Sequence, residues 1–170
     1  MTDHGAPRRR ITDALHRYCR GIDRMDADLI RSAYHDDGYD DHGDYFRGTV
    51  DEYIPWVLDL LGNRFVSTMH VLSNISIEFP ERTDGDDAGD RAYVESYLIA
   101  YHVTSGTGSL RIFGARYVDK FEDRPGAGWR IAHRTLVSEW QVEHAGNFVP
   151  TPPGTEPAAR DRTDPSYRRD

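Results

Sequence analysis

The sequence contains one cysteine, Cys19, and one lysine, Lys120, among its 170 residues. A single cysteine cannot form a disulfide within the chain, and this fits a reducing compartment such as the cytoplasm. No run of apolar residues is long enough to span a membrane, and the charged N-terminal residues are not followed by the apolar stretch of a signal peptide. The composition therefore predicts a cytoplasmic protein without a membrane partner.

Features that bind phosphate or nucleic acid are also missing. The net charge of -8 opposes a nucleic-acid partner. No glycine-rich phosphate loop is present, and the pairs Gly106/Gly108 and Gly126/Gly128 fall where hairpin turns are expected. We therefore expect no organic cofactor.

One acidic segment, residues 35–44, could be interpreted as a metal site. It contains His35, Asp36, Asp37, Asp40, Asp41, His42 and Asp44. It lacks the compact His-x-His or His-x-x-x-His spacing of metal ligands, and acidic glycine-containing loops are usually solvated turns. A solvated loop is the favoured interpretation, and no metal is expected.

The chain is long and apolar enough for one domain with its own core. We expect a loose N-terminal arm over residues 1–8 and the folded domain over residues 9–146. Residues 147–170 are rich in proline and charge, and they predict a tail that is either disordered or laid over a neighbouring subunit.

Three helices are expected in the first 62 residues. Apolar residues at helical spacing predict the first helix over residues 9–21, with Gly21 as its stop. Asp26 is a suitable N-cap for a second, short helix over residues 27–34. The Asp- and Gly-rich residues 35–48 are expected to be mostly loop, with room for a short strand, and a third helix follows over residues 49–62.

The hydrophobic pattern then changes to the period of β-strands. Four long strands are predicted over residues 67–79, 91–103, 110–122 and 129–143, joined by connections rich in turn residues. Three helices followed by an antiparallel meander indicate the α+β class. To bury the helices, the sheet must curve strongly around them and form a cone with a cavity inside.

The first long strand carries a histidine in its middle. Strict alternation places Met69, Val71, Ile75, Ile77 and Phe79 on one face and Thr68, His70, Leu72, Asn74 and Ser76 on the other. His70 could be a surface or a structural histidine, or it could face the cavity. Apolar residues on both faces suggest a cavity on one side and a subunit interface on the other.

The order of three segments carries a resemblance to a known family. They are "RYCRGIDRMDADLIRSAYHDDG", "STMHVLSNISIEF" and "GARYVDKFEDRPGAGWRIAHRTLVSEW". Over residues 9–143 the chain resembles the SnoaL-like branch of the nuclear transport factor 2 (NTF2-like) superfamily. The resemblance implies a cone-shaped α+β barrel and a homotrimer. It leaves the activity open, because the fold carries dehydratases, isomerases, cyclases, epoxide hydrolases and non-catalytic binding domains.

The resemblance implies four catalytic residues. The dehydratases and dehydrochlorinases of this branch have an aspartate after the first helix and a histidine on the first long strand, matched here by Asp23 and His70. Tyr18 and Arg116 match a tyrosine and an arginine of some members. The family's water-holding tyrosines have no unique match, since Tyr34, Tyr39 and Tyr45 are all available. Asp23 could instead be a turn residue, Tyr18 a core residue and Arg116 a surface ion-pair partner.

These residue types suit proton abstraction without a cofactor. A neutral histidine held by a carboxylate is a base that works near neutral pH. Arg116 or Tyr18 would stabilise charge on the substrate oxygen. The leading hypothesis is a dehydratase-type lyase with a His–Asp dyad that acts on a hydrophobic cyclic molecule such as a steroid, terpenoid or polyketide. An isomerase or polyketide cyclase, and a non-catalytic ligand-binding or subunit module, are the alternatives.

Overall fold

The computed structural model describes residues 4–81, 90–146 and 152–168. The helices are α1 (Gly5–Asp23), α2 (Ala27–Ala33) and α3 (Val50–Arg64), with a short 3-10 helix η1 (Pro165–Tyr167) near the C-terminus. The strands are β1 (Tyr34–Asp41), β2 (Arg47–Thr49), β3 (Phe65–Glu78), β4 (Asp90–Thr104), β5 (Leu110–Arg124) and β6 (Gly128–His144). In the described residues, no helix is both long and apolar enough to cross a membrane.

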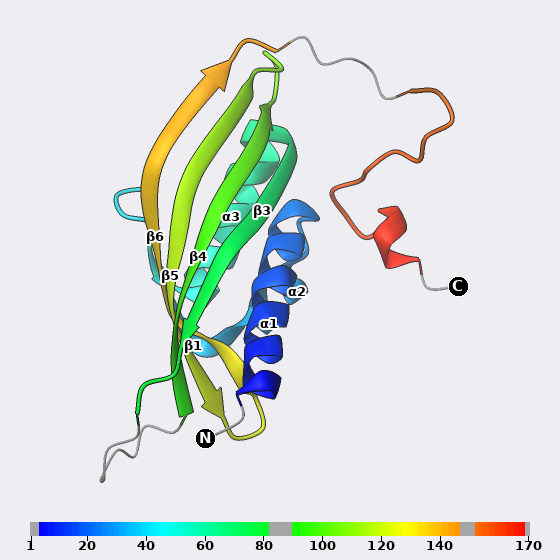
Figure 1. Cartoon of the computed structure of the whole chain (residues 1–170). Coiled ribbons are helices and arrows are strands. Elements are labelled where there is room, and N and C mark those ends of the chain that lie inside the picture. The colour runs from blue at the N-terminus through cyan, green and yellow to red at the C-terminus, as the bar shows by residue number, and fades with distance from the viewer. Residues whose placement is uncertain (1–3, 82–89, 147–151, 169–170) are drawn as a thin grey trace.

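One curved, unclosed sheet holds the strands in the order β2-β1-β6-β5-β4-β3. The long strands β3 to β6 form an antiparallel meander, and β1 joins the edge of β6 in parallel. The three helices pack on the inner face of this sheet (Figure 1). The apolar residues of α1 and α3 and the inward residues of the strands form one core. The α+β class and the curved sheet are confirmed.

Helix α1 is longer at both ends than the sequence predicts. It begins at Gly5, inside the expected arm, and it continues past Gly21 to Asp23. Gly21 does not stop the helix. It lets α2 approach closely, because a Cβ at this position would lie only 2.7 Å from the backbone nitrogen of Ile30. Asp26 is the N-cap of α2 as predicted, since its side chain accepts hydrogen bonds from the backbone N–H groups of Asp28 and Leu29.

The strands in residues 35–48 are longer than the short strand that the sequence allowed there, so the segment is not mostly loop. Strand β1, Tyr34–Asp41, pairs with β6, and the register joins Tyr34 with Ile131, which lies far away in the chain. Such a partner cannot be inferred from local composition. Residue Asp40 is fully buried within this strand.

Strand β3 contains a bulge that the strict alternation missed. Asn74 has a φ of 47°, and the register with β4 shifts between Ser73 and Ser76. The bulge moves the following residues to the opposite face. Met69 and Val71 therefore point outward as one group. Residues on both sides of the bulge point inward, namely Thr68, His70, Leu72, Ile75 and Ile77.

Within the C-terminal segment, residues 159–168 pack against their own chain. Asp164 forms an ion pair with Arg24 at the end of α1, and the hydroxyl of Tyr167 donates to Asp26. Figure 1 shows this segment returning from the far end of β6 to the side of α1 and α2. Residues 1–3, 147–151 and 169–170, which belong to the expected arm and tail, lie outside the described residues.

Candidate active site

Asp23 and His70 lie in direct contact. Helix α1 ends at Asp23, and its Oδ1 lies 2.7 Å from Nδ1 of His70, in the middle of β3. The second carboxylate oxygen accepts the backbone N–H of His70 at 2.9 Å. Because an ionised carboxylate can only accept, Nδ1 carries the proton and the lone pair of Nε2 is left available. The side chain of His70 is only 8% exposed.

A second histidine, His102, lies beside His70. It is buried on β4, and its ring centroid is 5.3 Å from that of His70. The aromatic rings of Phe65 and Phe113 flank it at 4.6 and 5.1 Å. Burial, aided by the neighbouring His70, lowers the pKa of His102 to about 3, so its ring is neutral near pH 7.

Both ring nitrogens of His102 and the hydroxyl of Thr68 are buried without a hydrogen-bond partner in the described part of the chain. Thr68 is paired with His102 across β3 and β4. A buried polar atom that lacks a partner within the protein is costly, and a bound ligand, an ordered water or a catalytic role can account for it. The sequence placed His102 on a strand, but it held no signal for this position beside His70.

Tyr18 lies in a different part of the interior. Its hydroxyl shares a 2.5 Å hydrogen bond with that of Tyr53, and burial raises its pKa. Its ring and that of Tyr117 cover the guanidinium of Arg134 at 4.2 and 3.9 Å. Arg134 is fully buried and forms a bidentate ion pair with Asp119 at 2.8 and 2.7 Å. The structure therefore groups Tyr18 with Arg134 and Tyr53, and within the described part of the chain it forms no hydrogen bond or ring contact with Asp23 or His70.

Arg116 lies on the outer face of the sheet, away from Asp23 and His70. Its guanidinium donates to Glu95 at 2.9 Å and to Glu139 at 2.7 Å. Alternation along β5 points Ala115 and Tyr117 inward and so turns Arg116 outward. The structure thus does not support Arg116 as a site residue, whereas Arg134 on the neighbouring strand β6 is buried on the inner face.

We expect Arg116→Gln to leave turnover and substrate affinity unchanged. The variant removes only contacts with two half-exposed glutamates on the outer face. Steady-state kinetics would check this, with Asp23→Asn as the contrasting variant. A loss of turnover in Arg116→Gln comparable to that in Asp23→Asn would restore the sequence-based assignment.

The acidic segment forms hydrogen bonds among its own residues. Buried Asp40 accepts the hydroxyl of Tyr34 at 2.5 Å and contacts Nδ1 of His42. Tyr34 is buried, whereas Tyr39 and Tyr45 are exposed. Within residues 4–81, 90–146 and 152–168, no group of three or more His, Cys, Asp or Glu side chains could hold a metal ion.

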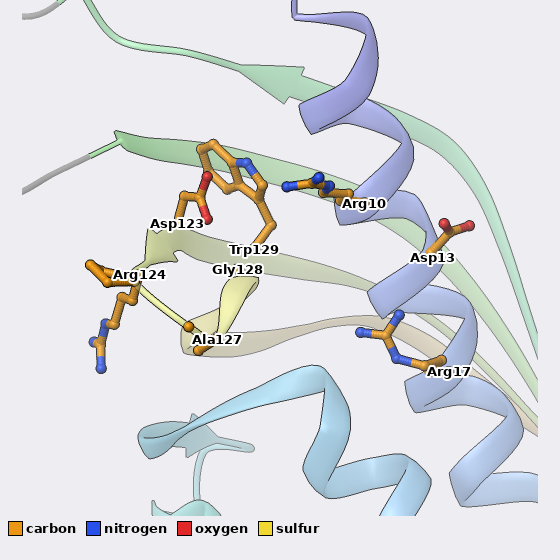
Figure 2. A pocket seen from close by; sticks show the side chains of 10 residues that line it. Arg10, Asp13, Arg17, Asp123, Arg124, Ala127, Gly128 and Trp129 are labelled. Carbon is orange, nitrogen blue, oxygen red and sulfur yellow. The ribbon is translucent and has the colours of Figure 1, made fainter.

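Two pockets open on the surface. Asp23 and His70 line a pocket with a volume of about 450 Å³. The other residues that line it are His16, Cys19, Arg20, Arg24, Leu72, Asp164 and Ser166. A larger pocket of about 690 Å³ lies between α1 and the hairpin that joins β5 to β6, where Arg10 and Arg17 extend toward Trp129 (Figure 2). The larger pocket contains neither Asp23 nor His70, so the chemistry of the Asp–His pair belongs to the smaller one.

The curved sheet and the three helices have the NTF2-like α+β fold. The model of the SnoaL-like domain matches residues 5–135, and the chain belongs to this family. No curated protein matches the sequence.

Solved structures share the fold at low sequence identity. A protein provisionally assigned as a scytalone dehydratase, from Novosphingobium aromaticivorans, is 23% identical with a TM-score of 0.70, over 92% of this chain and 100% of the other. Hexachlorocyclohexane dehydrochlorinase LinA-type3 from Novosphingobium barchaimii is 18% identical with a TM-score of 0.74, over 86% and 96%. An NTF2-like superfamily protein from Salmonella enterica serovar Typhimurium is 17% identical with a TM-score of 0.67, over 80% and 93%.

Proposed function

We propose that the protein is a cofactor-independent lyase that removes water from a hydrophobic cyclic small molecule such as a steroid, terpenoid or polyketide. The contact between Asp23 and His70 carries this proposal. It fixes the imidazole in the tautomer that a base requires, and it stabilises the imidazolium that forms when the base takes up a proton. The dehydratase and dehydrochlorinase among the similar structures support the reaction class.

The elimination needs one group that takes up a proton from carbon and then gives this proton to the leaving oxygen. Nε2 of His70 takes a proton from a carbon next to an activating carbonyl group, and the C–H electron pair forms the new C=C bond. The C–O bond on the neighbouring carbon breaks with its electron pair on oxygen. The imidazolium of His70 protonates this oxygen, which leaves as water, and His70 returns to its initial state.

One further side chain is suited to an oxygen atom of the substrate. Neutral His102 can donate an N–H group next to His70, where the leaving oxygen would lie. In a dry interior such a donor stabilises developing negative charge more strongly than it would in water.

The test is a screen of hydroxylated cyclic ketones for the absorbance of a new conjugated double bond. A product that is lighter than the substrate by about 18 mass units, the mass of one water molecule, would support the lyase. A product of unchanged mass would instead identify an isomerase or cyclase that uses the same base. Ligand binding without turnover would favour the non-catalytic module.

We expect the activity to survive removal of metal ions. His70, Asp23 and the interior donor His102 supply all the proton transfers that the elimination requires. The measurement is turnover after dialysis against a strong chelator in metal-free buffer. Activity that disappears and returns with a divalent ion would mean that the acidic residues 35–44 bind a metal, and the proposed mechanism would then be wrong.

We further propose that the chain forms a homotrimer through the outer face of the sheet. Two rows of outward residues cross strands β3 to β6 in register. The rows are Met69, Tyr101, Ile112, Val142 and Val71, Ile99, Gly114, Trp140. Met69 is 58% exposed and Trp140 49%. A continuous apolar surface of this kind is typical of a protein interface.

Sedimentation velocity at low micromolar concentration should therefore show a trimer. Met69→Asp should dissociate it, because it places a charge in the middle of the apolar rows. Ala27→Asp, which adds the same charge at the exposed start of α2, is the control. A monomer in the wild type would contradict the proposal, and a dimer would retain the interface but reject the stoichiometry.

A further inference from the structure

The C-terminal residues 159–168 form part of the wall of the candidate active site. Asp164 and Ser166 line the same pocket as Asp23 and His70. Asp164 is held in place by the ion pair with Arg24 and by the backbone N–H groups of Ala159 and Ser166. The segment that the sequence predicts as a tail is thus bonded to the rim of this pocket.

This segment brings Arg160 next to the Asp–His pair. Nη1 of Arg160 donates to the carbonyl oxygens of Leu61 and Phe65, and Nη2 lies 3.1 Å from the sulfur of Met25. The ring of Phe65 contacts His102, and Met25 follows Asp23 by two residues. Arg160 therefore contacts Phe65, which touches His102, and Met25, which lies close to Asp23 in the chain.

A second arginine, Arg20, lines the pocket from α1. Its Nη2 donates to the carbonyl and hydroxyl oxygens of Ser166, and its guanidinium lies 4.6 Å from the ring centroid of Tyr167. The Nε atoms of Arg20 and Arg160 are both buried, and neither has a hydrogen-bond partner in the described residues.

Neither guanidinium is neutralised by a carboxylate. Among the described residues, no ion pair includes Arg20 or Arg160, whereas their neighbour Arg24 is paired with Asp164. Asp23 is close, but both of its oxygens are bonded to His70. Two uncompensated cations beside one pocket are unusual in a chain of net charge -8. Their buried Nε donors lack an acceptor in the described residues, and next to an unpaired guanidinium charge an anionic acceptor forms the stronger hydrogen bond.

We propose that Arg20 and Arg160 bind a carboxylate group of the substrate, so that the substrate is a cyclic organic acid rather than a neutral compound. The guanidinium group presents its N–H donors in a planar arrangement that matches a carboxylate. This inference rests on the proposed function in one respect, namely that the reacting carbon of the substrate lies at His70. The recognition of the carboxylate is a separate property of the pocket.

The experiment compares two probes of nearly equal shape, cyclohex-1-ene-1-carboxylate and its neutral carboxamide. Binding to the full chain is followed through the backbone amide NMR signals of His70 and Ser166 at low ionic strength. The wild type should bind the carboxylate at least about tenfold more tightly than the amide, the usual scale of a charge-assisted contact. Arg160→Gln and Arg20→Gln should bring this ratio close to one.

Arg168→Gln is the matched control, because it removes the same charge from the same segment at a residue whose side chain forms an ion pair with Glu156, outside the pocket. It should retain the preference for the carboxylate. If Arg160→Gln releases the C-terminal segment, as the Ser166 signal would show, Arg20→Gln in α1 still tests the proposal. Equal affinity for the two probes in the wild type, no binding of either, or a preference retained in both variants would overturn it.

His70→Ala separates this inference from the proposed lyase function. The variant should lose turnover but keep the preference for the carboxylate. A wild-type protein that prefers the carboxylate but turns over no substrate would contradict the lyase function and leave the carboxylate site in place.

Discussion

His70→Ala should lower kcat by roughly 10²–10⁴-fold or more, the usual contribution of an essential general base. The variant removes the imidazole ring, whose Nδ1 is held by Asp23 and whose Nε2 would accept the proton. Initial rates with a substrate from the dehydration screen would measure the effect. Because the side chain contributes little apolar area, the circular dichroism spectrum and the thermal midpoint should stay close to those of the wild type.

Asp23→Asn should also be severe, because an amide can donate to Nδ1 and favour the tautomer that blocks Nε2 as a base. The matched control is Asp13→Asn, an exposed residue of the same helix that lines the other pocket. It should have no effect on turnover. Unchanged turnover in His70→Ala would exclude the proposed mechanism and favour a non-catalytic binding module.

The largest effect on stability is expected at the buried ion pair of Asp119 and Arg134. Both side chains are fully inaccessible, and the guanidinium is enclosed by the rings of Tyr18 and Tyr117. Asp119→Ala leaves a buried charge without its partner and should lower the free energy of unfolding by about 3–5 kcal/mol. Urea denaturation monitored by circular dichroism would measure the change.

Two further variants test whether the loss of stability comes from leaving a buried charge without its partner. The double variant Asp119→Leu with Arg134→Met removes both charges and should recover most of the lost stability. Glu143→Gln breaks an ion pair with Arg111 that is about half exposed, and it should cost at most about 1 kcal/mol. A loss below about 1 kcal/mol in Asp119→Ala would show that the buried pair contributes little to stability.

The sequence alone determined the order and type of most elements. Helical spacing in α1 and α3 and the alternation in the four long strands are local patterns, and a local pattern is enough to predict an element. The N-cap at Asp26 is also local, because its acceptors and donors lie within three residues. The contact between Asp23 and His70 was predicted through the family resemblance, since these two positions match its pattern.

The tertiary structure decided what depends on distant partners. Strand β1 exists because β6 offers a parallel edge, although the composition of residues 35–48 resembles a loop. The bulge at Asn74 reverses the inward face of β3, and no counting of alternate residues could locate it. Arg116 and Arg134 are both arginines on long strands, and only the packed sheet shows which one is buried.

The C-terminal segment is the strongest case of this dependence. Its proline and charged residues offer no apolar surface of their own, so the sequence predicts a tail. Its position is determined by ion pairs and hydrogen bonds to the ends of α1, α2 and α3, which come together only after the sheet has curved around the helices. Arg160 therefore reaches the neighbourhood of His70 and Asp23 only in the folded chain, because polar contacts between distant segments leave no periodic pattern in a sequence.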